Sequence, residues 1–244
     1  MGELVLLFLS TIRLRPYVFF FFGCFLGAAT ADLGWRRAGL FTGLTWLTAF
    51  VAEYSSTRTG IPFGLYHYIA ATRGQELYLA NVPFMDSLSF TFLAYGAFSL
   101  ARLVAGKWPG PVRLAFWSGI FMMLIDMLID PLAVRGDRWF LGKIFYYPNG
   151  GFYFGVPLSN FVGWAVVGWI GIGSYLAMAG PGRLGTNDPR WGVALYSWVW
   201  TFSLAMTWWI GEPALLSVGL ALSLALVVAF ACTVRQRAAL EDVT

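Results

Sequence analysis

The chain has 244 residues, of which 59% are hydrophobic, 18% aromatic and only 11% charged. A soluble domain carries about 25% charged residues, so a chain this poor in charge could not cover a water-exposed surface. Its sixteen Lys and Arg residues give a net charge of +4 but are scattered through the polar segments, which excludes a nucleic-acid partner. The composition predicts a single integral membrane domain over residues 1–244, with lipid solvating the apolar exterior.

Seven apolar segments are long enough for transmembrane helices, which need about 20 residues each. They cover residues 17–33, 38–56, 84–105, 112–132, 157–179, 191–210 and 213–233, after a short interfacial segment at 3–12. The sequence therefore predicts an all-α, multi-pass transmembrane bundle of about seven helices. The two long connections, 57–83 and 133–156, contain Gly, Pro and aromatic residues. The basic segments 106–111, 180–190 and the tail from Arg235 favour a cytoplasmic C-terminus.

Acidic side chains within or at the ends of spans are costly, and they usually face a protein interior, a partner or water. Five stand out: Glu53, Asp86, Asp126, Asp130 and Glu212. Asp126 and Asp130 are four residues apart, so a helix places both on one face. Two neighbouring carboxylates in a low-dielectric site do not both ionise easily, and the one that keeps its proton can act as an acid. The alternative is structural: Arg135 or Arg138 binds the pair, and Glu212 occupies a loop or caps the last span.

Two segments gather polar and aromatic residues at the ends of predicted spans, at 53–68 and 147–164. The first contains Glu53. The second places Asn160 just inside a span, where an amide needs hydrogen-bond partners. With seven spans both segments lie on one side of the membrane, and Asp86 and Asp130 lie near that side. Four chain regions thus bring polar groups to one membrane depth, which predicts a functional site there.

Several catalytic classes lack their residues in this sequence. The single histidine, His67, cannot form the histidine-rich di-iron site of membrane desaturases, and the two cysteines do not form an iron–sulfur pattern. No glycine fingerprint follows a strand, so nothing indicates a dinucleotide. We therefore expect neither a metal nor a cofactor. For Tyr66 and Tyr68, an ordinary aromatic belt at the membrane interface is the alternative to a site.

Four ordered motifs resemble a known family: EYSSTRTGIPFGLYHY at 53–68, VPFMDSLSF at 82–90, DMLIDPLAVRGDRWFLG at 126–142 and GGFYFGVPLSNFVGW at 150–164. Together they look like the membrane carotenoid-biosynthesis family, which includes carotenoid 1,2-hydratases acting on γ-carotene-type and bisanhydrobacterioruberin-type substrates. The resemblance is close over about 50–180. It implies a cofactor-independent hydro-lyase that takes its carotenoid from the lipid bilayer of a bacterial inner membrane, and it leaves room for association with other enzymes of the pathway.

The chemistry implied by the resemblance suits these residues. Protonation of C2 at an acyclic carotenoid end leaves a tertiary cation at C1, which water captures as a tertiary alcohol. Such a step needs a buried, protonated carboxylic acid. We expect this acid to be Asp130 or Asp126, Asp130 being nearer the convergent side. Glu53 and Asp86 are the next candidates, and either of them or Asn160 could hold the water.

The remaining residues of the predicted site would contact the substrate or its surroundings. Arg58 and Arg138 are expected to orient carboxylates. Aromatic faces could stabilise the cation; these are Tyr66, Tyr68, Phe152, Tyr153 and Trp164. Phe63 is expected to contact the substrate.

Three other functions fit the same pattern. A carotenoid end-group cyclase would share the cation but omit the water. A proton-coupled transporter or lipid-binding membrane protein would also carry intramembrane carboxylates. A non-catalytic subunit could hold other enzymes of the pathway together.

Overall fold

The computed structural model describes residues 2–105, 110–180 and 188–241, and the side chains of these residues apart from Ala105 and those after Cys232. Residues 106–109 and 181–187, and the side chains of the tail from Arg235, lie outside the described part. The basic segments that favour a cytoplasmic C-terminus fall largely there, so the orientation of the chain in the membrane stays a prediction.

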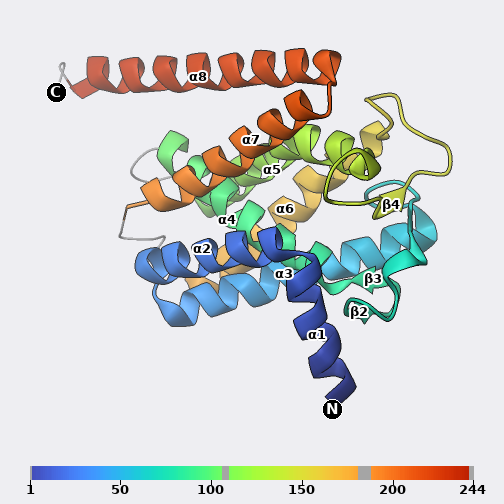
Figure 1. The fold of residues 1–244 in the computed structure, drawn as a ribbon. Coiled ribbons are helices and arrows are strands. Elements are labelled where there is room, and N and C mark those ends of the chain that lie inside the picture. The colour runs from blue at the N-terminus through green and yellow to red at the C-terminus, as the bar shows by residue number, and fades with distance from the viewer. Residues whose placement is uncertain (1, 106–109, 181–187, 242–244) are drawn as a thin grey trace.

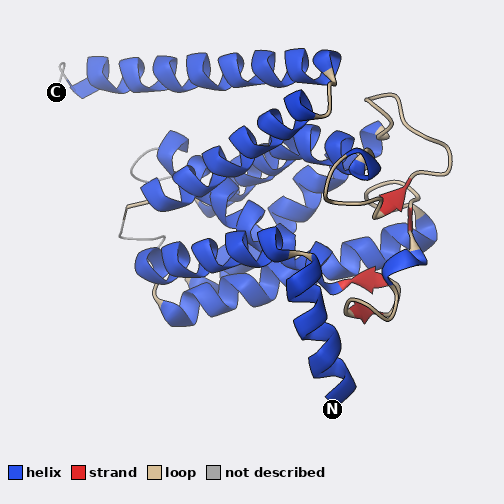
Figure 2. Cartoon of the chain, in the orientation of Figure 1, coloured by secondary structure: helices blue, strands red, loops and turns tan. Residues whose placement is uncertain are grey.

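Eight α-helices dominate the described residues (Figures 1 and 2). They are α1 (Gly2–Leu14), α2 (Pro16–Leu33), α3 (Trp35–Thr59), α4 (Phe84–Ala105), α5 (Pro111–Ala133), α6 (Leu158–Ala179), α7 (Arg190–Trp209) and α8 (Pro213–Glu241). The all-α class is confirmed, and a helix covers each predicted span and the predicted interfacial segment. The helices extend beyond several apolar segments, most clearly in α8, which continues past the predicted end at residue 233 to Glu241.

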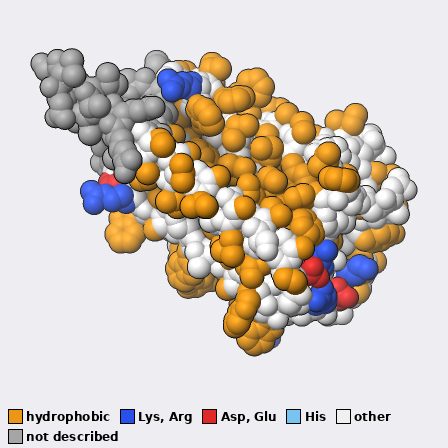
Figure 3. Space-filling model, turned by 90° about the horizontal axis from the view of Figure 1, so that it is seen from above, with side chains coloured by type: hydrophobic (Ala, Val, Ile, Leu, Met, Phe, Trp, Pro, Cys, Tyr) orange, Lys and Arg blue, Asp and Glu red, His pale blue; other side chains and the backbone are white. Residues whose placement is uncertain are grey.

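Five of these helices are long and apolar enough to cross a membrane: α2, α4, α5, α6 and α8 up to Cys232. The helices α3 and α7 fall outside this group, so the number of crossings is not confirmed as seven. Figure 3, which looks onto the face that carries α8, shows mostly hydrophobic side chains, with charged ones toward two ends of the molecule. An apolar band between charged ends is the surface of a membrane protein.

The two long connections lie at the same end of the bundle, as the sequence predicted (Figure 1). The first holds strands β1 (His67–Tyr68), β2 (Tyr78–Leu79) and β3 (Val82–Pro83) and the 3-10 helix η1 (Ala70–Thr72). The second holds β4 (Phe145–Tyr146) and the 3-10 helix η2 (Gly136–Arg138). β1 pairs antiparallel with β4, with His67 opposite Tyr146 and Tyr68 opposite Phe145. This short ladder joins segments that are almost 80 positions apart in the sequence.

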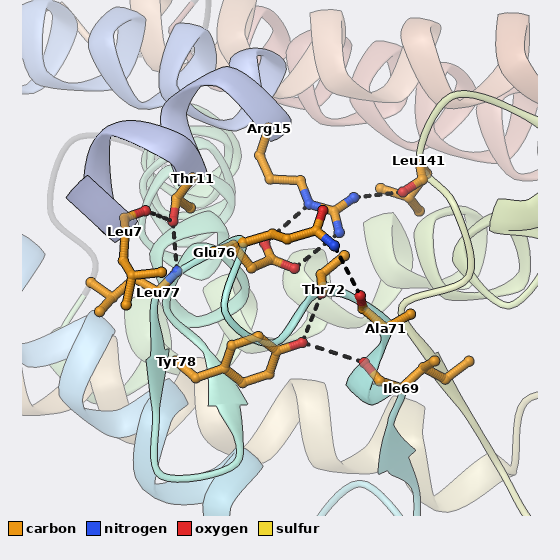
Figure 4. Close-up of polar contacts among 11 residues, drawn as sticks. Leu7, Thr11, Arg15, Ile69, Ala71, Thr72, Glu76, Leu77, Tyr78 and Leu141 are labelled. Carbon is orange, nitrogen blue, oxygen red and sulfur yellow. Dashed lines mark hydrogen bonds and ion pairs between the residues drawn. The ribbon is translucent and has the colours of Figure 1, made fainter. Parts of the chain in front are cut away.

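A buried ion pair fastens these connections to the start of the membrane helices (Figure 4). The Nε and Nη2 atoms of Arg15 lie 3.2 and 3.1 Å from the two carboxylate oxygens of Glu76, and both side chains are almost fully buried. The Nη1 atom of Arg15 donates to the carbonyl oxygen of Leu141 at 2.5 Å. Arg15 lies between α1 and α2, so a single guanidinium connects this junction to both long connections.

The helices α5 and α6 form the most closely packed pair, because glycines lie where their backbones meet. A Cβ atom added to Gly119 of α5 would lie 2.3 Å from the carbonyl oxygen of Ala165, and one added to Gly168 would lie 2.9 Å from the Met122 side chain. Small residues at such contacts let membrane helices approach closely. The short distance between the two backbones determines which side chains of α5 and α6 can contact each other.

We predict that Gly119→Ala destabilises the protein, because the added methyl group meets backbone atoms that can move only with the helix. The expected loss is about 1–3 kcal/mol, the usual cost of overpacking. Thermal unfolding of the detergent-purified protein measures it. The matched control is Gly173→Ala in α6, whose new methyl group would find its nearest neighbour, the Ala115 Cβ, at 3.7 Å. Equal melting temperatures for the two variants would contradict the prediction.

Candidate active site

A small cavity of about 40 Å³ lies inside the bundle at the end that carries the long connections. Four helices contribute its polar groups: α3 gives Glu53, α4 gives Asp86, α5 gives Asp130 and α6 gives Asn160. The other walls are mostly aromatic and come from Phe63, Tyr66, Phe90, Phe145, Tyr147 and Trp164, together with Ser89. The structure thus brings together seven of the residues that the sequence assigned to a site.

Asn160 links the two carboxyl groups of α5. Its Nδ2 atom donates to Oδ2 of Asp126 at 2.7 Å and to Oδ2 of Asp130 at 2.8 Å, and all three residues are buried. One amide nitrogen carries two hydrogens, so it can serve both acceptors at once. Asp130 and Asn160 line the cavity, whereas Asp126 does not. The Oδ1 atom of Asp126 is buried with no hydrogen-bond partner.

Phenol groups from the long connections donate to the other side of the cavity. The Tyr68 hydroxyl donates to Asp86 Oδ2 at 2.5 Å and lies 3.2 Å from the hydroxyl of Tyr66. The Tyr147 hydroxyl lies 3.4 Å from Asp130 Oδ2, a long contact. Burial raises the pKa of Tyr66 and Tyr68 well above the ordinary value, and the neighbouring carboxyl groups raise it further. Both side chains therefore stay neutral phenols that can donate.

Glu53 receives its hydrogen bond from Ser87 of α4. Sequence reasoning did not single out Ser87, Ser89, Phe90, Phe145 or Tyr147. A signal existed for two of them, because Ser89 and Phe90 follow Asp86 at helical spacings of three and four and so share its face. Phe145 and Tyr147 carry no local signal, since only the pairing of β1 with β4 brings their segment over the cavity.

The expectation that Arg58 orients a carboxylate is wrong. Its guanidinium lies over the Tyr54 ring at 3.4 Å and donates to Asn81 Oδ1 at 2.7 Å, on the exposed side of α3. Five helical residues at roughly 100° each place Arg58 about 140° around α3 from Glu53, so the two side chains point apart.

Arg138 binds a carboxylate, as expected, but this is Glu212, which does not line the cavity. The structural alternative for the aspartate pair is wrong. Arg138 and Arg135 both bind Glu212, in the turn between α7 and α8. Arg135 also donates to the carbonyl oxygens of Pro131 and Phe154. Glu212 stands directly before α8, and its carbonyl accepts from the Leu216 amide at 2.9 Å, as expected for a helix cap. Slight burial opposes ionisation of Glu212, but the two guanidinium groups outweigh it and lower the pKa.

Phe152 and Tyr153 lie outside the cavity. The Phe152 side chain is 90% exposed, and the Tyr153 ring packs edge-on against Phe161, with centroids 5.1 Å apart. The chain here folds back tightly: Tyr153 and Val156 exchange two backbone hydrogen bonds, and a Cβ at Gly151 would lie 2.0 Å from the carbonyl carbon of Val156. This turn directs Phe152 outward. Aromatic content alone could not predict it.

An apolar cleft of about 120 Å³ adjoins the small cavity. The two share Asp86, Ser89, Asp130, Phe145 and Trp164 as a common wall. The rest of the cleft is lined by side chains of α2, α4, α5 and α7 and by Trp139, Leu141 and Ile144 of the second long connection. An apolar channel therefore ends at a cluster of carboxyl groups. Among the described residues, no group of three or more His, Cys, Asp or Glu side chains could hold a metal ion.

Known proteins offer two comparisons for this arrangement. A curated relative, the bisanhydrobacterioruberin hydratase of Haloarcula japonica, is 31% identical over 167 residues, which are 66% of this chain and 54% of the relative. The chain thus spans about half the length of that protein. No solved structure matches the present chain. The profile of the carotenoid biosynthesis protein family matches residues 4–228, which is nearly the whole chain, and the chain therefore belongs to that family.

Proposed function

We propose that this protein adds water across the terminal 1,2 double bond of an acyclic carotenoid end. The observation that carries the proposal is the position of the carboxyl groups at the inner end of an apolar cleft. A hydrocarbon end group can reach these carboxyl groups without leaving apolar surroundings. Family membership and the hydratase name of the curated relative support the same chemistry. We expect the protein to work in the inner membrane of a bacterium.

The reaction begins with proton transfer from the carboxylic acid of Asp130 to C2. The electron pair of the double bond forms the new C–H bond and leaves a tertiary cation at C1. A water molecule attacks C1, and a neighbouring carboxylate takes the proton that this water releases. One water is added and one double bond is lost, so no electron donor or acceptor is needed.

Asp130 is the best placed acid because it lines both the cavity and the cleft. Asp126 lines neither of them, which suits a supporting role behind Asn160. Asp86 also lines both spaces and, like Asp130, accepts hydrogen bonds. Asp130 differs because it shares the Asn160 amide with Asp126, and two neighbouring carboxyl groups do not both ionise easily. Glu53 lines the small cavity but not the cleft. We assign the small cavity to the attacking water. A volume of about 40 Å³ is enough for a water molecule, and its polar walls offer the partners that a buried water needs.

Aromatic faces at the shared wall would stabilise the cation. Trp164 and Phe145 border both spaces, and Phe90 stacks on Trp164 with ring centroids 5.1 Å apart. The negative face of an aromatic ring attracts a cation, most strongly when water is excluded. These rings replace Phe152 and Tyr153 of the sequence-based hypothesis.

We predict that Asp130→Asn abolishes hydration, because an amide cannot supply the proton. Loss of a general acid lowers a rate by about 10²–10⁴-fold. The protein is expressed in a host that makes lycopene or γ-carotene, and mass analysis of the pigments detects products heavier by one water. Asp137→Asn, on the exposed η2 segment, is the matched control and should act like the wild type.

Wild-type amounts of the hydroxylated product from Asp130→Asn would show that another group is the acid. The same masses test the alternative of an end-group cyclase, because cyclisation changes no mass. If the host that expresses the wild-type protein forms a new pigment of unchanged mass and no product heavier by one water, the protein is a cyclase and the proposed hydration is wrong.

We also predict that Asn160→Leu lowers both stability and activity. Leucine has the same branched arrangement of side-chain heavy atoms as asparagine but removes the amide donor from two buried carboxyl oxygens, at a cost of about 1–3 kcal/mol. Thermal unfolding in detergent and the pigment assay measure the two effects. The control is Asn149→Leu in the exposed loop before α6, which should change neither. An Asn160→Leu protein as stable and active as the wild type would contradict the assigned role.

A further inference from the structure

We infer that the apolar cleft holds the extended polyene chain next to the reacting end, and that this chain enters from the lipid between α2 and α7. The inference rests on the proposed function. It adds a chain-binding site and a direction of approach, which neither the family nor the relative's name supplies.

The position of the cleft supports a lateral entrance. One wall contains Asp86 and Asp130, and another is formed by α2 and α7, the latter with Val199, Phe202 and Ser203. α2 is one of the helices apolar enough to span a membrane, and it has exposed hydrophobic side chains beside the cleft. A substrate dissolved in lipid therefore meets this wall before it meets the carboxyl groups.

Aromatic rings form the contact between these two helices. Phe20 and Phe21 of α2 both pack edge-on against Trp198 of α7, with centroids 5.3 and 5.7 Å apart. Phe21 also meets Phe202 at 6.1 Å. Phe20 and Trp198 are about half exposed. A seam of rings can open by side-chain rotation, and its faces are well suited to a flat conjugated chain.

The Arg15–Glu76 ion pair fixes the remaining side of the cleft. Arg15 holds the carbonyl of Leu141, whose side chain lines the cleft, and Tyr17, two residues after Arg15, lines it as well. The edge of the cleft at Leu141 is thus fastened by a buried ion pair. At the α2–α7 edge, the contacts named above are all between aromatic rings. The α2–α7 edge is the one that can admit a chain.

Ser203→Trp tests the inference because Ser203 is buried in the cleft wall and takes no part in the proposed reaction. The measurement uses the Asp130→Asn background, in which bound substrate is not consumed. Each protein is reconstituted into phosphatidylcholine nanodiscs with lycopene, extracted into detergent and repurified to remove the lipid and the lycopene dissolved in it, and the lycopene still bound is read from the absorption spectrum. We expect Asp130→Asn to retain lycopene and the added Ser203→Trp to reduce retention at least tenfold. The control, Leu220→Trp on the exposed face of α8, adds the same side chain outside the cleft and should retain the pigment.

Retention by the Ser203→Trp protein equal to that of its background would overturn the inference, and so would equal loss in the Leu220→Trp control. If the background itself retains no lycopene, a lipid acyl chain fills the cleft and the inference also fails. Should Ser203→Trp not accumulate, Ser203→Leu takes its place, with the same expected direction. Failure of the proposed function reads differently: the wild type would bind lycopene but form no product heavier by one water.

Discussion

The site depends on one amide group, that of Asn160, which donates to two carboxyl groups on successive turns of α5. Burying a carboxyl group without a donor is costly, so this contact offsets part of the cost of keeping Asp126 and Asp130 inside the bundle. The amide side chain is short, and it reaches both aspartates only because α5 and α6 pack backbone to backbone at Gly119 and Gly168. Helix packing in the middle of the bundle thereby determines the chemistry at its end.

The long connections complete the site from outside. They supply Tyr68 to Asp86, Tyr147 to Asp130 and the aromatic ring of Phe145 to the wall between cavity and cleft. The pairing of β1 with β4 and the ion pair of Arg15 with Glu76 hold these segments together. A buried ion pair is weak evidence for stability, but it does favour one arrangement over others. Here it specifies how two otherwise irregular segments close over the carboxyl groups.

Hydropathy predicted a helix at every span, because the need to satisfy backbone groups in lipid leaves few alternatives. The convergence of Glu53, Asp86, Asp130 and Asn160 could also be predicted, since each lies at the helix end that adjoins one of the two long connections. The arginines could not be assigned from sequence proximity. Arg58 lies five residues after Glu53 but on another face of α3. Arg138 forms an ion pair with Glu212, which lies far along the sequence in the turn between α7 and α8. Phe152 and Tyr147 are both aromatic residues of the second long connection, and residue type does not distinguish them. The tight turn at 150–156 leaves the Phe152 ring exposed, whereas the β1–β4 pairing places Tyr147 in the cavity wall.

The unequal surroundings of the aspartates suggest why the chain carries a pair rather than one acid. Asp130 borders both the cleft and the cavity, while Asp126 lines neither, is bound by Asn160, and has a buried Oδ1 atom without a hydrogen-bond partner. A carbocation is short-lived and reacts with any water it meets, so the acid must act where apolar walls admit only the intended molecule. Placing the second carboxyl behind an amide lets it influence the charge of the first without opening the cleft to water. In the proposed reaction the polar cavity beside Glu53 adjoins the reacting end, so the packing of the four helices that line this cavity sets the direction of water attack.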